Sequence, residues 1–107
     1  MATQSQILSK LKSLGTLLGK DKGEGAGPYT NLAILCHKNA KATVSAFRNV
    51  AESLGLEEDK YGGDGEVGGI TFVDDKYDLL LCFYPYIDSN YQYSYTVVLA
   101  SLMEKDY

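Results

Sequence analysis

The segment from Leu79 to Tyr84 (Leu-Leu-Leu-Cys-Phe-Tyr) restricts the fold of this chain more than any other segment. Successive side chains of a strand point to opposite faces of a sheet, and here both sets are apolar. This pattern is typical of a strand that is buried on both faces. N-terminal helices can cover one face, so the other face needs a second cover. We expect self-association as a homodimer or, in a monomer, coverage by the 30–38 segment.

Three strand-like segments follow one another in the C-terminal half of the chain, over residues 69–73, 77–84 and 91–102. The connections between them, residues 74–76 and 85–90, are short. Short connections favour antiparallel neighbours, so the pattern predicts a three-stranded meander.

A helix is predicted near the N-terminus. Thr3 and Gln6 fit a capping box, in which each side chain satisfies a backbone amide of the first turn. Apolar residues then recur at helical spacing over residues 7–18. The pattern predicts a helix of about four turns. Gly15 inside it indicates either close packing or a weak helix.

A second helix is predicted from Ala40, where apolar residues again follow helical spacing, to Gly55, which is suited to end it. Leu56 is positioned for the hydrophobic contact that accompanies such an end. The preceding segment, Thr30–Lys38, fits either a strand or a helix. We favour a helix because alanines and lysines follow it without a turn signal.

Residues 1–107 are expected to form a single domain, since their number and their 45% hydrophobic content are those of a globular unit. We expect an α+β fold in which N-terminal helices pack on a three-stranded antiparallel meander. Two glycine-rich segments, residues 20–30 and 57–69, are predicted to be flexible loops.

Charge is distributed unevenly along the sequence. Residues 1–48 carry seven basic and two acidic side chains, whereas residues 49–107 carry three basic and twelve acidic ones, which gives a net charge of −4. The molecule therefore has an acidic side unless the two halves interleave in space. An acidic chain is a poor binder of nucleic acid, because such binding depends on neutralising phosphates.

The expected location is the cytoplasm. Two cysteines do not make a disulfide scaffold, which is the hallmark of small secreted domains. No apolar run reaches the length of about 20 residues that a membrane helix needs, so we expect no membrane association.

Side chains that carry enzyme chemistry are scarce. Cys36 and His37 are adjacent, and sequence neighbours point in different directions, so they do not form a nucleophile–base pair. Cys82 lies in the most apolar segment, where cysteine is usually a packing residue. One histidine and two distant cysteines do not supply a usual zinc site, and the 59–66 segment fails the calcium-loop pattern. We predict no enzyme activity, no metal and no cofactor.

Tyrosine is concentrated around the third predicted strand, since five of the nine tyrosines lie from Tyr84 to Tyr95. Tyr95 is in phase with apolar residues further along the strand and is predicted to join the core. Tyr91 and Tyr93 lie nearer a loop and are predicted to be exposed, where tyrosine contributes rigid contact area to interfaces. Residues 84–100 contain no lysine or arginine, which favours a protein partner over RNA.

Together these patterns predict a non-catalytic acidic binding protein, an inhibitor of a basic, nucleic-acid-handling protein. In size and charge it is comparable with phage counter-defence proteins and immunity proteins. Acidic side chains steer the partner and tyrosines anchor it. The predicted contact residues are Glu57, Glu58, Asp59, Asp64, Glu66, Asp74, Asp75, Tyr91 and Tyr93.

Two alternative functions stay open from the sequence. One is a small dimeric chaperone or assembly factor that holds a client protein. The other is a small enzyme or ligand-binding domain whose site the sequence does not reveal.

Overall fold

The computed structural model describes residues 2–24, 27–59, 69–87 and 94–105. Within them, two helices, α1 (Gln4–Lys12) and α2 (Ala40–Ser53), accompany one antiparallel sheet. The strands of the sheet are β1 (Thr16–Glu24), β2 (Pro28–Cys36), β3 (Glu57–Glu58), β4 (Gly69–Val73), β5 (Tyr77–Ile87) and β6 (Ser94–Glu104). Their order across the sheet is β1-β2-β6-β5-β4-β3.

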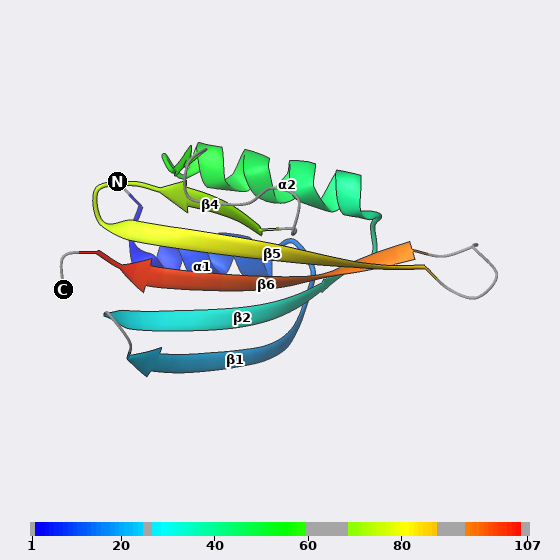
Figure 1. Ribbon diagram of the computed structural model, residues 1–107, viewed down its shortest axis with the longest axis horizontal. Helices are drawn as coiled ribbons and strands as arrows, with labels where there is room; N and C mark the ends of the chain where they lie inside the picture. Colours follow the sequence, from blue (N-terminus) through cyan, green and yellow to red (C-terminus); the bar gives the residue numbers. More distant parts are fainter. Residues whose placement is uncertain (1, 25–26, 60–68, 88–93, 106–107) are drawn as a thin grey trace.

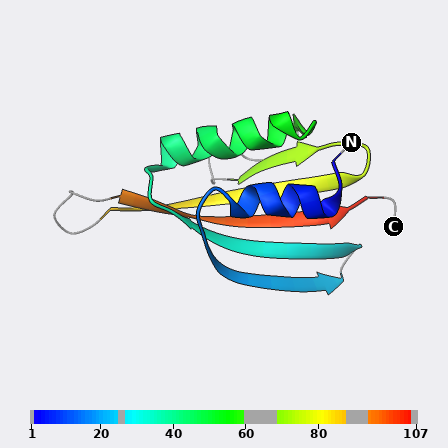
Figure 2. The ribbon, with the colours of Figure 1, turned by 180° about the vertical axis from the view of Figure 1, so that it is seen from behind.

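Both helices lie on the same side of the sheet. In Figure 1 the strands pass in front of α1, and in Figure 2, seen from behind, α1 lies in front of the strands. α2 contacts α1 and packs on β5 and β6. In the described part of the chain, no helix covers the opposite face of the sheet.

The α+β class agrees with the structure, but the three-stranded meander is wrong. β4, β5 and β6 form the predicted meander, and the sheet then continues through β2 and β1. The predicted 20–30 loop belongs largely to these two added strands. β1 tolerates glycines and charges because it is an edge strand, exposed at almost every residue. Such a strand has no apolar–polar alternation by which it could be detected.

The predicted 57–69 loop also needs correction at both of its ends. Residues 57–58 form the short strand β3, which pairs with β4, and residue 69 begins β4. Residues 60–68, the centre of the predicted loop, lie outside the described part of the chain.

The first helix begins as predicted and ends early. Thr3 Oγ1 accepts a hydrogen bond from Gln6 N at 3.2 Å, and Gln6 Oε1 accepts one from Thr3 N at 2.8 Å, which completes the capping box. The helix ends at Lys12, and the apolar residues beyond it enter a turn and β1. The turn requires Gly15, because a Cβ there would collide with the carbonyl oxygen of Leu35. Close packing is therefore the reason for this glycine.

The segment 30–38 is most of strand β2 followed by a bend, not the helix that we favoured from its composition. Leu32, Ile34 and Cys36 alternate with half-buried residues and are themselves buried on the helix side. β2 pairs with β6 along most of its length, a contact between distant parts of the chain that no local pattern contains. The segment is part of the sheet and does not cover its second face.

The second helix agrees with the prediction at both ends. Asn39 caps its start, where Oδ1 accepts a hydrogen bond from Ala42 N at 2.8 Å. Gly55 follows the last turn at φ 84°, and Leu56 N donates to Ala51 O at 3.0 Å, as in a Schellman motif. Leu56 is buried, which confirms its predicted hydrophobic contact.

Strand β5 continues through Pro85 to Ile87, beyond its predicted end at Tyr84. β4 pairs with β5 only as far as Cys82, so among the described residues no strand flanks one side of the last part of β5. Proline is tolerated at such an edge, because its missing N–H is not needed there for pairing.

The core lies between the two helices and the helix side of the sheet. Phe47 of α2 packs edge-on against Phe83 of β5, with ring centroids 5.9 Å apart and planes at 82°. Ile7 and Leu11 of α1 are fully buried, as is Leu81 of β5. This core uses only one of the two apolar faces of β5.

Candidate binding surfaces

The face of the sheet opposite the helices is open and apolar over its central strands. On β5, Leu80 and Tyr84 are 41% and 46% exposed, and on β6 Leu99 is 44% exposed. The strand register brings these side chains together, because Cys82 pairs with Leu99 and Tyr84 pairs with Val97. We call this surface the uncovered face. Its central residues are Ala33, Leu35, Leu80, Cys82, Tyr84, Val97 and Leu99.

A hollow of about 540 Å³ lies in the uncovered face, across β1, β2, β6 and β5. Ala33 and Cys82 flank Leu99 in register, and Gly19 continues the same row on β1. These small residues leave space beside the larger leucines. The next row of the hollow is polar on β1, β2 and β6, with Asp21, Asn31 and Ser101, and ends at Leu80 on β5. The hollow can therefore receive an apolar side chain from outside the chain.

The structure brings together some of the acidic residues predicted to bind a partner. Glu57 of β3 pairs with Val73, the last residue of β4, and Asp74 and Asp75 follow directly in the chain. These residues line a second hollow, of about 470 Å³, with Lys105 also on its wall. We call this surface, made of Glu57, Asp74 and Asp75, the acidic end.

Asp74 has a structural role that the sequence pattern does not reveal. Its Oδ1 accepts hydrogen bonds from the backbone N–H groups of Lys76 at 2.8 Å and Tyr77 at 2.6 Å, which holds the β4–β5 turn. Lys105 Nζ donates to the Asp74 carbonyl oxygen at 2.9 Å. Asp75 is exposed and presents its charge to solvent.

The other predicted contact residues have different positions. Glu58 accepts a hydrogen bond from Arg48 at 2.9 Å, so this ion pair offsets its charge. Asp59 N donates to Thr71 O at 2.8 Å and so continues the pairing of β3 with β4. Four predicted contact residues lie outside the described part of the chain and stay predictions: Asp64, Glu66, Tyr91 and Tyr93.

Tyr95 is not in the core, although its predicted phase along the strand is right. It is half-buried and shares the uncovered side of β6 with Val97 and Leu99, because Thr96 takes the helix side. Its ring stacks on that of Tyr86, with centroids 5.0 Å apart and planes at 12°.

The acidic end and the Tyr86–Tyr95 stack lie at opposite ends of the sheet. β5 begins at Tyr77, beside the acidic turn, and carries Tyr86 near its far end (Figure 1). At a rise of about 3.3 Å per residue, the two sites are about 30 Å apart. A partner bound at the acidic end reaches the stacked tyrosines only if it is at least that long.

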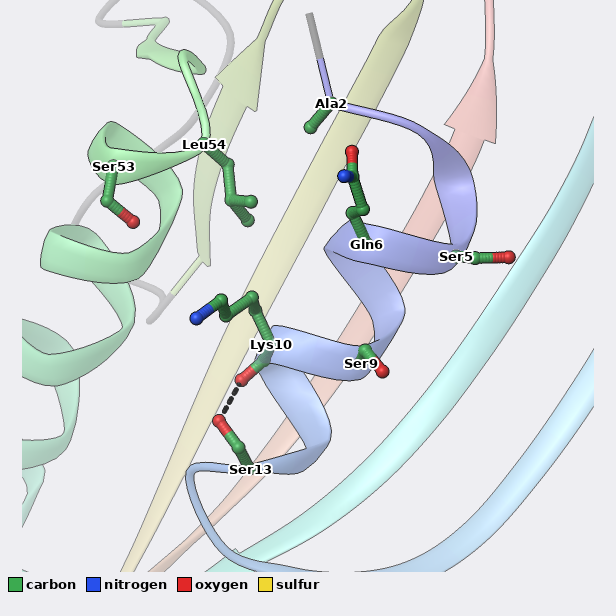
Figure 3. A pocket seen from close by; sticks show the side chains of 8 residues that line it. All are labelled: Ala2, Ser5, Gln6, Ser9, Lys10, Ser13, Ser53 and Leu54. Carbon is green, nitrogen blue, oxygen red and sulfur yellow. Dashed lines mark hydrogen bonds between the residues drawn. The ribbon is translucent and has the colours of Figure 1, made fainter.

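A groove of about 770 Å³ lies between α1 and α2 (Figure 3). Its polar side chains serve the helices themselves: Ser13 Oγ donates to Lys10 O at 2.6 Å, and Ser53 Oγ donates to Val50 O at 2.7 Å. Gln6 is engaged in the capping box. The eight lining residues include one cation, Lys10, and no acid or imidazole. These eight residues therefore supply no acid–base pair to the groove.

The cysteines and the histidine do not converge. Cys36 is 2% exposed, and its thiol donates to Leu14 O at 3.6 Å. Burial raises the pKa of the Cys36 thiol, and nearby Lys38 offsets part of this effect. His37 is exposed in the bend that follows, and Cys82 is on the opposite face of the sheet. Both cysteines are free. The described residues contain no cluster of His, Cys, Asp or Glu that could hold a metal ion.

No family model, curated protein sequence or solved structure matches this chain. Among the described residues, neither helix is long and apolar enough to cross a membrane.

The sequence indicates a second apolar face on β5 but not which residues complete it. Ala33 and Leu35 come from a segment that we assigned to a helix, and Gly19 comes from the glycine-rich stretch around the predicted 20–30 loop. The alternation of Leu32, Ile34 and Cys36 was the signal that could have identified β2.

Proposed function

We propose that this chain is a non-catalytic binding protein that captures a basic protein partner at its acidic end. The observation that supports this proposal is the excess of acidic side chains on strands β3 to β6 and their turns. β1 and β2 occupy one edge, and β6, β5, β4 and β3 follow in that order toward the other. The two halves of the sequence therefore meet at one strand boundary and otherwise do not interleave within the sheet.

The imbalance is clear from the charges of the described residues. Residues 57–59, 69–87 and 94–105 carry seven acidic and two basic side chains, a net charge of −5. Residues 2–24 and 27–56 carry seven basic and three acidic side chains, a net charge of +4. Strands β1 and β2 carry no net charge, so the positive charge lies on α1, on α2 and on the bend between β2 and α2. The negative charge lies on strands β3 to β6 and their turns, which include the acidic end.

Such a charge distribution acts on a partner before contact. Exposed charges interact over roughly 8 Å at physiological salt, so carboxylates gathered at one end orient an approaching basic surface and raise its association rate. Glu57 and Asp75 are exposed and contribute directly. The carboxylates of Glu58 and Asp74 are engaged within the chain and contribute less.

The partner class that we propose is a basic protein that handles nucleic acid. Such proteins present Lys and Arg side chains that neutralise phosphates. Carboxylates at the acidic end compete for the same side chains, and the resulting complex blocks the nucleic acid. Nucleic acid itself is repelled by the acidic end.

The proposal is tested with two double variants of equal charge change. The first, Glu57→Gln with Asp75→Asn, neutralises the acidic end. The control, Asp21→Asn with Glu24→Gln, removes two exposed carboxylates from β1, at the opposite edge of the sheet. Association with immobilised poly-L-lysine is measured by biolayer interferometry over a range of salt concentrations.

We expect the acidic-end variant to associate about threefold more slowly at low salt and to show a flatter salt dependence. The control should stay close to the wild type. Equal losses in the two variants would show that only net charge matters and would overturn the proposal.

The uncovered face favours a second candidate function, a small assembly factor that works as a dimer. An apolar surface of this extent is uncommon on a monomeric protein and marks a contact site. This function requires an occupant for the uncovered face.

A further inference from the structure

We propose that a second copy of this chain packs on the uncovered face of the sheet and forms a face-to-face dimer. This inference concerns a surface separate from the acidic end and does not depend on the identity of a partner. Three observations support it: the edges of the sheet are poorly suited to pairing, the uncovered face is large, and its centre combines projecting leucines with a recess.

The two edges of the sheet are protected against pairing with another chain. β1 carries Lys20, Asp21, Lys22 and Glu24, and its register shifts between Leu17 and Gly19. Charged side chains and bulges of this kind discourage an added strand. At the other edge, β3 has only two residues, and the part of β5 beyond Cys82 that no described strand flanks contains Pro85, which cannot donate to an added strand. Contact between two copies is therefore expected through the apolar face of the sheet and not through its edges.

The size of the uncovered face fits a stable dimer. β1, β2, β6, β5 and β4 span about 24 Å at the usual spacing of about 4.8 Å per strand. β2 and β6 are paired over eight residues, from Tyr29 to Cys36 on β2, which is about 27 Å of strand. The product is about 650 Å², within the range of roughly 600–1,000 Å² that each partner contributes to a standard interface.

The centre of the face is complementary to itself. Leu80 and Leu99 project with 41% and 44% of their surface exposed, while the hollow beside them is bounded by Ala33 and Gly19. A Cβ added at Gly19 would meet nothing within 4 Å. Each copy therefore presents both an apolar projection and a recess that can receive one, as a two-fold symmetric interface requires.

The seven central residues of the uncovered face carry no charge, so two copies meet without like-charge repulsion there, while Asp21 lines the hollow on its β1 side. Two sheets packed face to face approach to about 10 Å, which removes the exposed leucines from water. The acidic end lies at the β4–β5 turn, outside the centre of the contact, so the dimer carries two acidic ends.

The test is sedimentation equilibrium of the full chain from about 1 to 200 µM, a range in which a moderate dimer dissociates on dilution. The wild type should approach twice 11.7 kDa at the highest concentration. Leu99→Asp introduces a charge at the centre of the face and should weaken association at least about tenfold. Ile87→Asp is the matched control, since Ile87 is 63% exposed on β5 but alternates onto the opposite face.

A second variant distinguishes loss of association from loss of folding in Leu99→Asp. Gly19→Val has space for its side chain and adds a residue with a strong strand preference, so it should fold at least as well as the wild type. It fills the recess and should also weaken association about tenfold. Circular dichroism melts of all variants check the fold.

Three outcomes would overturn the proposal. One is a wild type that stays at 11.7 kDa throughout. Another is a dimer that Leu99→Asp and Gly19→Val leave intact, which would assign the contact to an edge or to the helices. The third is a monomer that binds the apolar dye 1-anilinonaphthalene-8-sulfonate and loses it in Leu99→Asp, which would assign the face to a small apolar ligand.

Discussion

The two faces of strand β5 have nearly the same apolar composition and entirely different surroundings. Leu81 is fully buried while its neighbour Leu80 is 41% exposed, and Phe83 is 8% exposed while Tyr84 is 46% exposed. The difference comes from α1 and α2, which both pack on one side of the sheet. The sequence of the strand therefore shows that both faces are apolar. Which face is buried in the monomer, and so stabilises it, depends on where the helices pack.

The helix side of the sheet stabilises the monomer, and the uncovered face is available for association. Apolar groups on the helix side lose their water when the monomer folds, so they contribute to its stability. Those on the uncovered face keep much of their exposed surface, so in the monomer they contribute less. Their burial is available for association, which is why we assign this face to a second copy of the chain.

The largest expected effect comes from the same substitution on the two faces. Leu81→Ala leaves a cavity in the core and should lower the free energy of unfolding by about 2–5 kcal/mol. Leu80→Ala, one residue away, should cost less than about 1 kcal/mol. Urea denaturation at low micromolar concentration, where the proposed dimer dissociates, measures both. Similar costs for the two leucines would contradict the assignment of the faces.

Two glycines, Gly15 and Gly69, differ in the space available for a side chain. Gly15 is packed against the Leu35 carbonyl, with Ile34 Cγ2 2.9 Å and Cys36 Sγ 3.0 Å from an added Cβ. Gly15→Ala should therefore cost about 1–3 kcal/mol through overpacking. At Gly69 the nearest atoms to an added Cβ are 3.6 Å away or more, an ordinary contact. Gly69→Ala should change stability by less than about 0.5 kcal/mol, and thermal melts of both variants test the contrast.

Much of the helical structure follows from local patterns. The capping box at Thr3 and Gln6 and the glycine end at Gly55 act within a few residues, so the sequence contains the whole signal. β4 likewise begins and ends at the predicted residues, Gly69 and Val73. These elements are determined by contacts between near neighbours in the chain.

The rest of the sheet depends on contacts that the sequence does not display. β1 is an edge strand with glycines and charges, and only its pairing with β2 makes it a strand. β2 pairs with β6, far along the chain, so its local pattern fits a helix as well as a strand. The uncovered face combines β2, β5 and β6, and its extent could not be predicted before that pairing was known.

A smaller effect is expected from polar groups on the two faces of β6. Thr96 is fully buried, and its Oγ1 donates to Lys38 O at 2.9 Å. Thr96→Val removes this hydrogen bond and should cost about 1 kcal/mol. Ser101 is half-buried on the uncovered face, and Ser101→Ala should change stability by less than about 0.5 kcal/mol. Equal losses in the free energy of unfolding, measured by urea denaturation, would show that the two faces are equally shielded from water and would contradict the account.

The two native cysteines report on the two faces directly, because Cys36 lies on the helix side and Cys82 on the uncovered face. Alkylation at a fixed maleimide concentration, resolved by mass spectrometry, is compared at about 1 and about 200 µM protein. The thiolate is the reactive form, so burial and the raised pKa of Cys36 should protect it at both concentrations. Cys82 should react readily in dilute protein and about tenfold more slowly in concentrated protein, where a second copy covers it. A Cys82 rate that does not depend on protein concentration, or a Cys36 that reacts as fast as Cys82, would contradict the account.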